Sequence, residues 1–291
     1  MPNATQKQII KEAISSFPVF ATHLWHFLRL PSPTPVQYQL ADYLQNGPNR
    51  RIIMAYRGCG KSFLTAGYVL WRLRKDPDTK VLVISAAQDR ADAFSVFCHD
   101  LLRNWFMVQD LFPSDTQRFS KVAFDVFGSK PDQSPSVRSS GIFGQITGSR
   151  ADLIVADDVE TPQSCETQLI RDKLRESIKE FDSVIKPGGE IVFLGTPHTQ
   201  DSIYAKLELA GYSPRIWPAI YPTAKKRKDY YQNRLAPKIA SDLDNDKTLA
   251  GHPTDSGRFG WEELEARKES IGRSTFNLQF LLDISLSDEE K

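Results

Sequence analysis

One short segment near the N-terminal third of the chain carries the residues best suited to chemistry. An apolar run at 52–55 is followed by a turn with Gly58 and Gly60, and then by Lys61 and Ser62 at the start of an amphipathic pattern. This order predicts a strand, a glycine turn and a helix N-terminus, which together bind phosphate through backbone N–H groups. The lysine supplies positive charge for the outer phosphates of a nucleotide, and the serine hydroxyl suits Mg²⁺.

The segment departs from the phosphate-loop pattern at one position. The pattern has glycine first, whereas this chain has Ala55. An alanine at a strand end is compatible with the loop if its φ is negative. The alternative is an ordinary glycine turn followed by a lysine, which the strand and helix on either side disfavour. The predicted loop consists of Arg57, Gly58, Cys59, Gly60, Lys61 and Ser62, with Cys59 as a small filler.

A second candidate site lies about a hundred residues further along. Four apolar residues, 153–156, end in Asp157 and Asp158, and Glu160 follows. A buried parallel strand would deliver these carboxylates at its carboxyl end, where open α/β sheets bind ligands. We expect Asp157 to hold Mg²⁺ and either Asp158 or Glu160 to act as general base for an attacking water. Acids at a strand end are also common helix N-caps.

Two further residues fit a nucleotide site. Gln37 follows a proline-led segment just upstream of the phosphate loop, and its amide can donate to and accept from adenine, with Tyr38 or Tyr43 stacking on the ring. Thr196 follows an apolar strand at 190–194, where a hydroxyl would sense the γ-phosphate. Each has a plainer interpretation, a surface glutamine at a helix start and a threonine that caps a turn. We take the neighbouring His198 as structural.

Composition sets the broad class. The chain has 291 residues, a net charge of +1 and 40% hydrophobic residues, enough for one large α/β domain or two small ones. Its three cysteines have no paired spacing, so neither a zinc site nor a disulfide framework is predicted. No apolar run approaches the roughly 20 residues that span a bilayer, and no signal peptide is apparent. We expect a cytosolic protein with no membrane partner.

The order of the elements predicts an α/β fold. Apolar runs and amphipathic patterns alternate from 51 to 217, which indicates a mainly parallel sheet with helices on both faces. We expect 129–140 to be a loop, 164–184 to be one helix and 187–189 to be a turn. The basic run 225–228, followed by Tyr230 and Tyr231, is either a solvated face or a contact for a phosphate backbone.

The motifs together resemble the N-terminal ATPase part of the large terminase subunit of tailed phages, especially short-tailed podophages. The matching segments are 33–37, 54–62, 83–87, 148–160, 194–197 and 251–255. The resemblance implies a RecA-like P-loop ATPase of the additional-strand class over residues 1–220, and a lid over 221–291. It also implies ATP and Mg²⁺ as cofactors, double-stranded DNA, portal protein and small terminase subunit as partners, and a location in the host cytoplasm.

In such a family the subunits form a ring during packaging, and an arginine stabilises the transition state of the γ-phosphate. Arg57 matches an arginine in the loop itself, and Arg150 matches one supplied by a neighbour. In that family the aspartate that holds Mg²⁺, the Walker B aspartate, is usually followed by a catalytic Glu. Here Asp157 is followed by Asp158. Full-length relatives carry a C-terminal nuclease domain, which we expect to be absent, and the isolated chain is expected to be a monomer with weak activity.

Two other functions remain open on sequence. A helicase-like ATPase shares the Gln37 motif, the Walker pair and the threonine, but needs a second RecA-like domain that the residues after 220 do not suggest. A non-catalytic scaffold would bind nucleotide only to order an interface.

Overall fold

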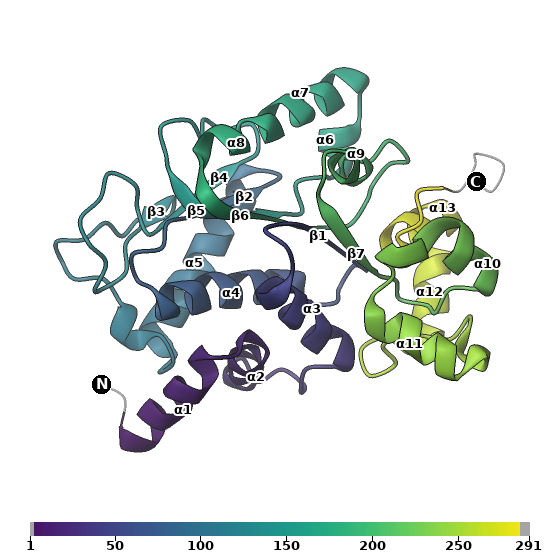
Figure 1. Ribbon diagram of the computed structural model, residues 1–291, viewed down its shortest axis with the longest axis horizontal. Helices are drawn as coiled ribbons and strands as arrows, with labels where there is room; N and C mark the ends of the chain where they lie inside the picture. Colours follow the sequence, from purple (N-terminus) through teal and green to yellow (C-terminus); the bar gives the residue numbers. More distant parts are fainter. Residues whose placement is uncertain (1–2, 286–291) are drawn as a thin grey trace.

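The computed structural model describes residues 3–285, and strands and helices alternate around one central sheet (Figure 1). Every pair of neighbouring strands is parallel except β3 with β4, so the predicted mainly parallel sheet is confirmed. The strand order is β3-β4-β2-β5-β6-β1-β7. The strands are β1 (Arg50–Ala55), β2 (Val81–Ser85), β3 (Ala123–Phe124), β4 (Val137–Gly141), β5 (Ala151–Asp157), β6 (Ile185–Gly195) and β7 (Ser213–Trp217).

The placement of β6 decides which loops meet. This strand lies between β1, which leads into the phosphate loop, and β5, which ends in the acid pair. The three strands are parallel, with Met54 beside Gly195 and Leu194 beside Asp157. Their carboxyl ends therefore share one edge of the sheet. β6 is an additional strand between the strand that leads into the phosphate loop and the strand that ends in the acid pair, as the additional-strand class requires.

Helices cover both faces of the sheet (Figure 1). The central strands are buried along their length, which explains their continuous apolar sequences. One face carries α1 (Ala4–Ile14), α2 (Phe17–Phe27), α3 (Pro35–Asn46), α4 (Lys61–Lys75) and α5 (Gln88–Asn104), and the other carries α6 (Pro162–Cys165), α7 (Gln168–Lys179), α8 (Phe181–Val184) and α9 (Ile203–Leu209). Within the described residues, every helix is too short or too polar to cross a lipid bilayer.

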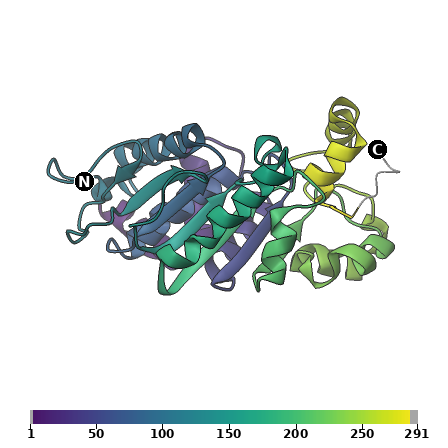
Figure 2. The same cartoon turned by 90° about the horizontal axis from the view of Figure 1, so that it is seen from above.

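Beyond β7, residues 221–285 form a mostly helical group at one end of the sheet, which we call the C-terminal lobe (Figure 2). It contains α10 (Ala224–Lys226), α11 (Pro237–Asn245), α12 (Trp261–Ile271), α13 (Arg273–Phe276) and the short helices η2 (Arg227–Tyr231), η3 (Gln232–Arg234), η4 (Lys247–Leu249) and η5 (Asn277–Leu281). The domain boundary at 220 stays a prediction.

The basic run lies in this lobe. Lys226 pairs with Asp283 at 2.7 Å and Arg227 with Asp244 at 2.7 Å. Tyr230 and Tyr231 are buried. Both phenols donate hydrogen bonds to backbone carbonyls of the lobe. The two tyrosines therefore do not form an exposed stacking surface beside the basic run.

Three expectations about secondary structure were wrong. The predicted loop 129–140 contains most of β4, because Ser95 and Ser139 pair their hydroxyls at 2.7 Å and so allow a serine-rich strand to be buried. The predicted turn 187–189 lies inside β6, where Gly188 has φ of 77° beside an irregularity in the pairing with β5. The predicted helix 164–184 is divided into α6, α7 and α8, and Thr167 caps the start of α7.

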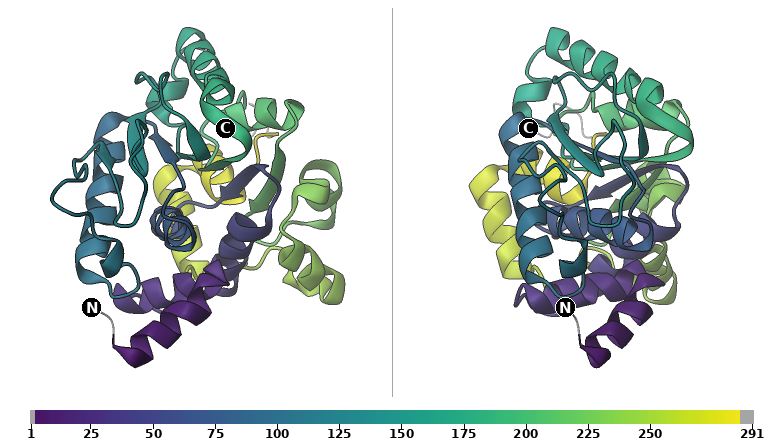
Figure 3. Two further views of the ribbon diagram at one scale, coloured as in Figure 1. Left: turned by 60° about the vertical axis from the view of Figure 1, so that its left-hand side comes forward. Right: turned by 90° about the vertical axis from the view of Figure 1, so that its left-hand side faces the viewer.

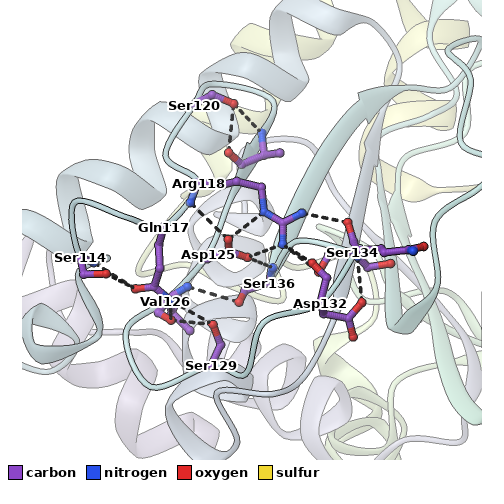
Figure 4. Close-up of polar contacts among 12 residues, drawn as sticks. Ser114, Gln117, Arg118, Ser120, Asp125, Val126, Ser129, Asp132, Ser134 and Ser136 are labelled. Atoms are coloured by element: carbon purple, nitrogen blue, oxygen red, sulfur yellow. Dashed lines mark hydrogen bonds and ion pairs between the residues drawn. The ribbon is translucent and has the colours of Figure 1, made fainter.

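The irregular segment between α5 and β4, which includes the short helix η1 (Gln109–Leu111), contains an ion pair with several further hydrogen bonds. Arg118 donates to the Asp125 carboxylate through Nε at 2.8 Å and through Nη2 at 3.1 Å (Figure 4). The same guanidinium donates to the backbone carbonyls of Asp132, Gln133 and Ser134. Arg118 thus holds together two parts of this loop. The loop lies at the β3 edge of the sheet, whereas the C-terminal lobe lies at the β7 end (Figure 1 and Figure 3).

Candidate nucleotide site

The phosphate loop connects β1 to α4 through two left-handed glycines. Gly58 and Gly60 have φ of 90° and 95°, a region that L side chains rarely adopt. A Cβ on Gly58 would lie 2.9 Å from Phe259, and a Cβ on Gly60 would lie 3.1 Å from Gln37. Ala55 is not among the described residues with positive φ, so alanine is tolerated at the first position of the pattern as expected. No side chain caps α4, which leaves its N-terminus suited to an anion.

Lys61 is buried beneath this loop. Its Nζ donates to the Ala55 carbonyl at 2.9 Å, to the Tyr56 carbonyl at 3.5 Å and to Thr196 Oγ1 at 3.1 Å. Burial alone would lower the pKa of Lys61, but Cys59 and the carboxylates of Asp158 and Asp157 raise it above its ordinary value. The lysine therefore stays charged, and its bond to Thr196 joins the loop to the end of β6.

The acid pair stands at the end of β5, on the same edge of the sheet. Asp157 is the last residue of the strand, and Asp158 adopts a left-handed φ of 47° while its N–H donates to the Leu194 carbonyl at 2.8 Å. Oδ1 of each aspartate is buried without a hydrogen-bond partner among the described residues. Burial and the neighbouring Asp158 raise the pKa of Asp157, although Lys61 opposes the shift. Two half-buried carboxylates, each with one buried oxygen that lacks a partner, favour the binding of a cation.

Glu160 is not available to bind a cation, because hydrogen-bond donors occupy both of its oxygens. Its side chain is fully buried; Oε1 accepts from the His198 N–H at 2.6 Å, and Oε2 accepts from Ser202 Oγ and the Ile203 N–H, both at 2.8 Å. Burial raises the pKa of Glu160 above its ordinary value, although the hydrogen bonds from its backbone donors and from Ser202 oppose the shift. The carboxylate thus fixes the chain that follows β6 and leads into α9.

A cleft of about 650 Å³ opens beside the acid pair. Its walls include Arg57, Asp158, Thr196 and also Glu160, all predicted from sequence. Arg57 is anchored at the cleft, because its Nη1 donates to Gln279 Oε1 at 3.3 Å.

Two residues of this cleft had not been selected from sequence. His198 lines it, and burial lowers the pKa of this histidine to about 4, so the ring is neutral at pH 7. Arg90, in the first turn of α5, lines the cleft as well. Its guanidinium forms no hydrogen bond or ion pair with residues 3–285. An arginine at the start of the helix after the second parallel strand was the available signal for Arg90.

Arg150 lies far from this cleft within its own chain. It precedes the first residue of β5, and a strand of that length separates it from Asp157 by about 20 Å. Its guanidinium is exposed and donates to the Ser183 carbonyl at 2.9 Å. Arg150 therefore cannot act on a nucleotide bound to the same subunit.

Gln37 is buried against the phosphate loop. Its Nε2 donates to the Cys59 carbonyl at 2.9 Å, and its Oε1 accepts from the Thr34 N–H at 3.0 Å in a capping box that begins α3. Tyr43 is held elsewhere, since its phenol donates to the Ser213 carbonyl and its ring packs on Trp217. The glutamine thus supports the loop directly, and its contact with adenine stays a prediction.

Comparisons with known proteins agree with this arrangement. The sequence is 43% identical over 288 residues to the large terminase subunit of Enterobacteria phage T3, covering 97% of this chain and 49% of that protein. The chain thus spans about half the length of this curated relative. No protein-family model matches the sequence.

Solved structures show the fold independently. The large terminase ATPase domain of Thermus phage P74-26 aligns with a TM-score of 0.51 at 14% identity, covering 89% of this chain and 96% of that one. The large terminase of bacteriophage HK97 aligns with a TM-score of 0.49 at 16% identity, over 93% of this chain and 54% of that one. The alignment with the P74-26 domain confirms the RecA-like α/β fold predicted from the sequence.

Proposed function

Since this chain belongs to the phage large terminase subunits, we propose that it is the ATP-hydrolysing motor domain of a DNA-packaging machine. The observation that carries the proposal is the meeting of Lys61, Thr196 and the acid pair at the carboxyl ends of three adjacent parallel strands. A nucleoside triphosphate at the carboxyl edge of the sheet would have its phosphates at the α4 N-terminus and its γ-phosphate between Lys61 and Asp158. The reaction is hydrolysis of ATP to ADP and phosphate.

The residues present fit a magnesium ion. Among residues 3–285 no cluster of three or more His, Cys, Asp and Glu side chains could hold a metal. Mg²⁺ in such sites is usually bound by one or two protein groups plus phosphate oxygens and water, so a small ligand set is sufficient. The unpaired Oδ1 of Asp157 and the Ser62 hydroxyl would hold the ion. When bound, it would neutralise charge that develops on the phosphates.

Asp158 is our candidate for the general base. Its unpaired Oδ1 and its position on the cleft would let it accept a proton from the attacking water. Glu160 would support the catalysis only indirectly, because both of its oxygens are held by donors from 198–203. Thr196, bonded to Lys61, would sense the γ-phosphate and report its loss to β6.

Two arginines are assigned to different subunits. Arg57, at the cleft, would contact the γ-phosphate in its own subunit, whereas Arg150 would reach only the site of a neighbour in a ring. Such an arginine typically accelerates hydrolysis by roughly 10³–10⁵. Ring assembly, together with double-stranded DNA, portal protein and the small terminase subunit as partners, forms part of the proposal.

The helicase-like alternative lacks a second domain in the described residues. Residues 221–285 contribute helices and turns but no strand to the sheet, so the C-terminal lobe is not a second RecA-like unit within that range. The scaffold alternative differs from the motor in turnover alone. A helicase would be recognised by the separated DNA strands it produces. A scaffold would bind ATP without hydrolysing it.

The deciding experiment measures phosphate release with ATP, Mg²⁺ and double-stranded DNA. We expect Lys61→Ala to abolish turnover while circular dichroism and the melting temperature show a folded protein. A matched control is Lys80→Ala, which removes another buried lysine, one that lies outside the site. Equal phosphate release by the wild type and Lys61→Ala would refute the proposal.

A further inference from the structure

A buried carboxylate of the C-terminal lobe contacts the residue that leads into the phosphate loop. Asp255 is only 5% exposed. Its Oδ2 accepts hydrogen bonds from the Tyr56 phenol at 2.6 Å and from Thr34 Oγ1 at 2.8 Å. Tyr56 directly precedes the phosphate loop, and Thr34 precedes α3 and caps it. One side chain of the lobe therefore joins the two segments that would surround a nucleotide.

The turn that begins at Asp255 makes further contacts with the loop. The Asp255 carbonyl accepts from the N–H groups of Arg258 and Phe259, each at 2.9 Å, which fixes the turn. Arg258 Nε then donates to the Gly58 carbonyl at 3.0 Å. The Phe259 ring packs edge-on against Tyr56 at 5.8 Å and occupies the space that a side chain on Gly58 would need.

The last short helix of the lobe holds the loop from a second direction. The Arg57 N–H donates to the Gln279 carbonyl at 3.0 Å. In the same helix Phe280 packs against Phe259 at 6.3 Å, and its carbonyl accepts from the Ala219 N–H at 2.8 Å. The lobe thus bonds to Tyr56, which precedes the phosphate loop, and to the first two residues of the loop, Arg57 and Gly58.

We propose that Asp255 is a positioning residue that couples the phosphate loop to the C-terminal lobe, so that nucleotide binding at the loop and ordering of the lobe reinforce each other. The inference rests on the proposed function, since it needs a nucleotide at this loop. A glycine-containing loop loses conformational freedom when it binds phosphate, and contacts that already fix it reduce that loss. Coupling of this kind is reciprocal, so nucleotide must order the lobe as strongly as the lobe favours nucleotide.

Tyr56→Phe tests the coupling with the smallest change, because it removes one hydroxyl and keeps the ring against Phe259. We expect the Kd of a fluorescent ATP analogue with Mg²⁺ to rise at least about fivefold. Tyr68→Phe is the matched control, since its buried hydroxyl contacts Arg51 and lies outside the loop. Asp255→Asn keeps one acceptor oxygen and is expected to have an intermediate effect. The double variant Tyr56→Phe/Asp255→Asn should show a smaller loss than the product of the single losses.

Hydrogen exchange supplies a measurement that a merely structural role would not change. In the wild type, the saturating analogue is expected to slow amide exchange at 57–64 and also at 276–282. In Tyr56→Phe the protection at 57–64 should persist at saturation, while the added protection at 276–282 falls by at least half.

The outcomes separate the two proposals. If the wild type binds the analogue no better than Lys61→Ala, the proposed function is overturned and the coupling with it. If the wild type binds and Lys61→Ala does not, but Tyr56→Phe matches Tyr68→Phe in affinity and lobe protection, only the coupling is refuted.

Discussion

The contrast between Asp158 and Glu160 yields the sharpest prediction about catalysis. Both acids follow β5, and both line the same cleft, yet their surroundings differ. Asp158 has a buried oxygen without a partner, whereas both oxygens of Glu160 accept hydrogen bonds. Asp158→Asn should therefore remove catalysis with little change in stability, and Glu160→Gln should do the reverse.

The magnitude for Asp158→Asn follows from its role and its backbone. Asparagine has nearly the same shape and tolerates the left-handed φ of 47° at this position. A positioned general base contributes roughly 10²–10⁴ in rate, which corresponds to about 3–5 kcal/mol in the activation free energy. We expect kcat to fall by that factor, and the melting temperature to change by at most about 2 °C.

The magnitude for Glu160→Gln follows from its donors. A glutamine keeps one acceptor oxygen, but its NH₂ group would face either the His198 N–H or the Ser202 and Ile203 donors. Buried groups left without partners destabilise by about 1–3 kcal/mol each. We expect the free energy of unfolding to fall by about 3 kcal/mol and the melting temperature by roughly 6–10 °C.

The assay measures phosphate release per folded subunit at saturating ATP, at a temperature where both variants are folded, beside thermal unfolding. Binding of a fluorescent ATP analogue shows that each site still accepts nucleotide. An Asp158→Asn variant with wild-type kcat, or a Glu160→Gln variant with wild-type stability and no activity, would refute the assignment.

Two other predictions concern the two candidate arginines and the ion pairs of Glu190. Arg150→Ala and Lys61→Ala should each be inactive alone. Their mixture should regain ATPase activity at concentrations where subunits assemble, because Arg150 of a Lys61→Ala subunit would reach the nucleotide on the intact loop of an Arg150→Ala subunit. Mixing Arg57→Ala with Lys61→Ala should restore no activity. Glu190→Gln removes the carboxylate that pairs with Arg51 at 2.8 Å and Arg72 at 2.6 Å, so urea unfolding at pH 7 should show about 2–3 kcal/mol less stability. Burial would raise the pKa of Glu190 but the two arginines lower it, so its contribution is present above pH 4.5 and is lost as the pH falls through the folded-state pKa, and the difference should shrink at pH 3.

Local patterns were sufficient wherever the chemistry is set by consecutive residues. The phosphate loop needs two residues at positive φ before a lysine, and only glycine serves there readily, so Gly58, Gly60 and Lys61 are legible in the sequence. Buried parallel strands need continuous apolar runs, which identified the segments that became β1, β2 and β5. The weakly apolar strand β4 was missed, because its burial depends on a hydroxyl pair between Ser139 and Ser95 of α5.

The sequence by itself determined that a phosphate loop and a strand ending in two acids exist, because each is encoded within about a dozen neighbouring residues. Only the tertiary structure decided what those residues face. The surroundings of Asp158 and Glu160 differ because the chain at 198–203 returns to hold the Glu160 carboxylate and not that of Asp158. Arg150 is excluded from its own site by the length of β5, and Asp255 meets Tyr56 across 199 positions of sequence. Contacts between residues so far apart depend on the path of the whole chain, and no local spacing records that path.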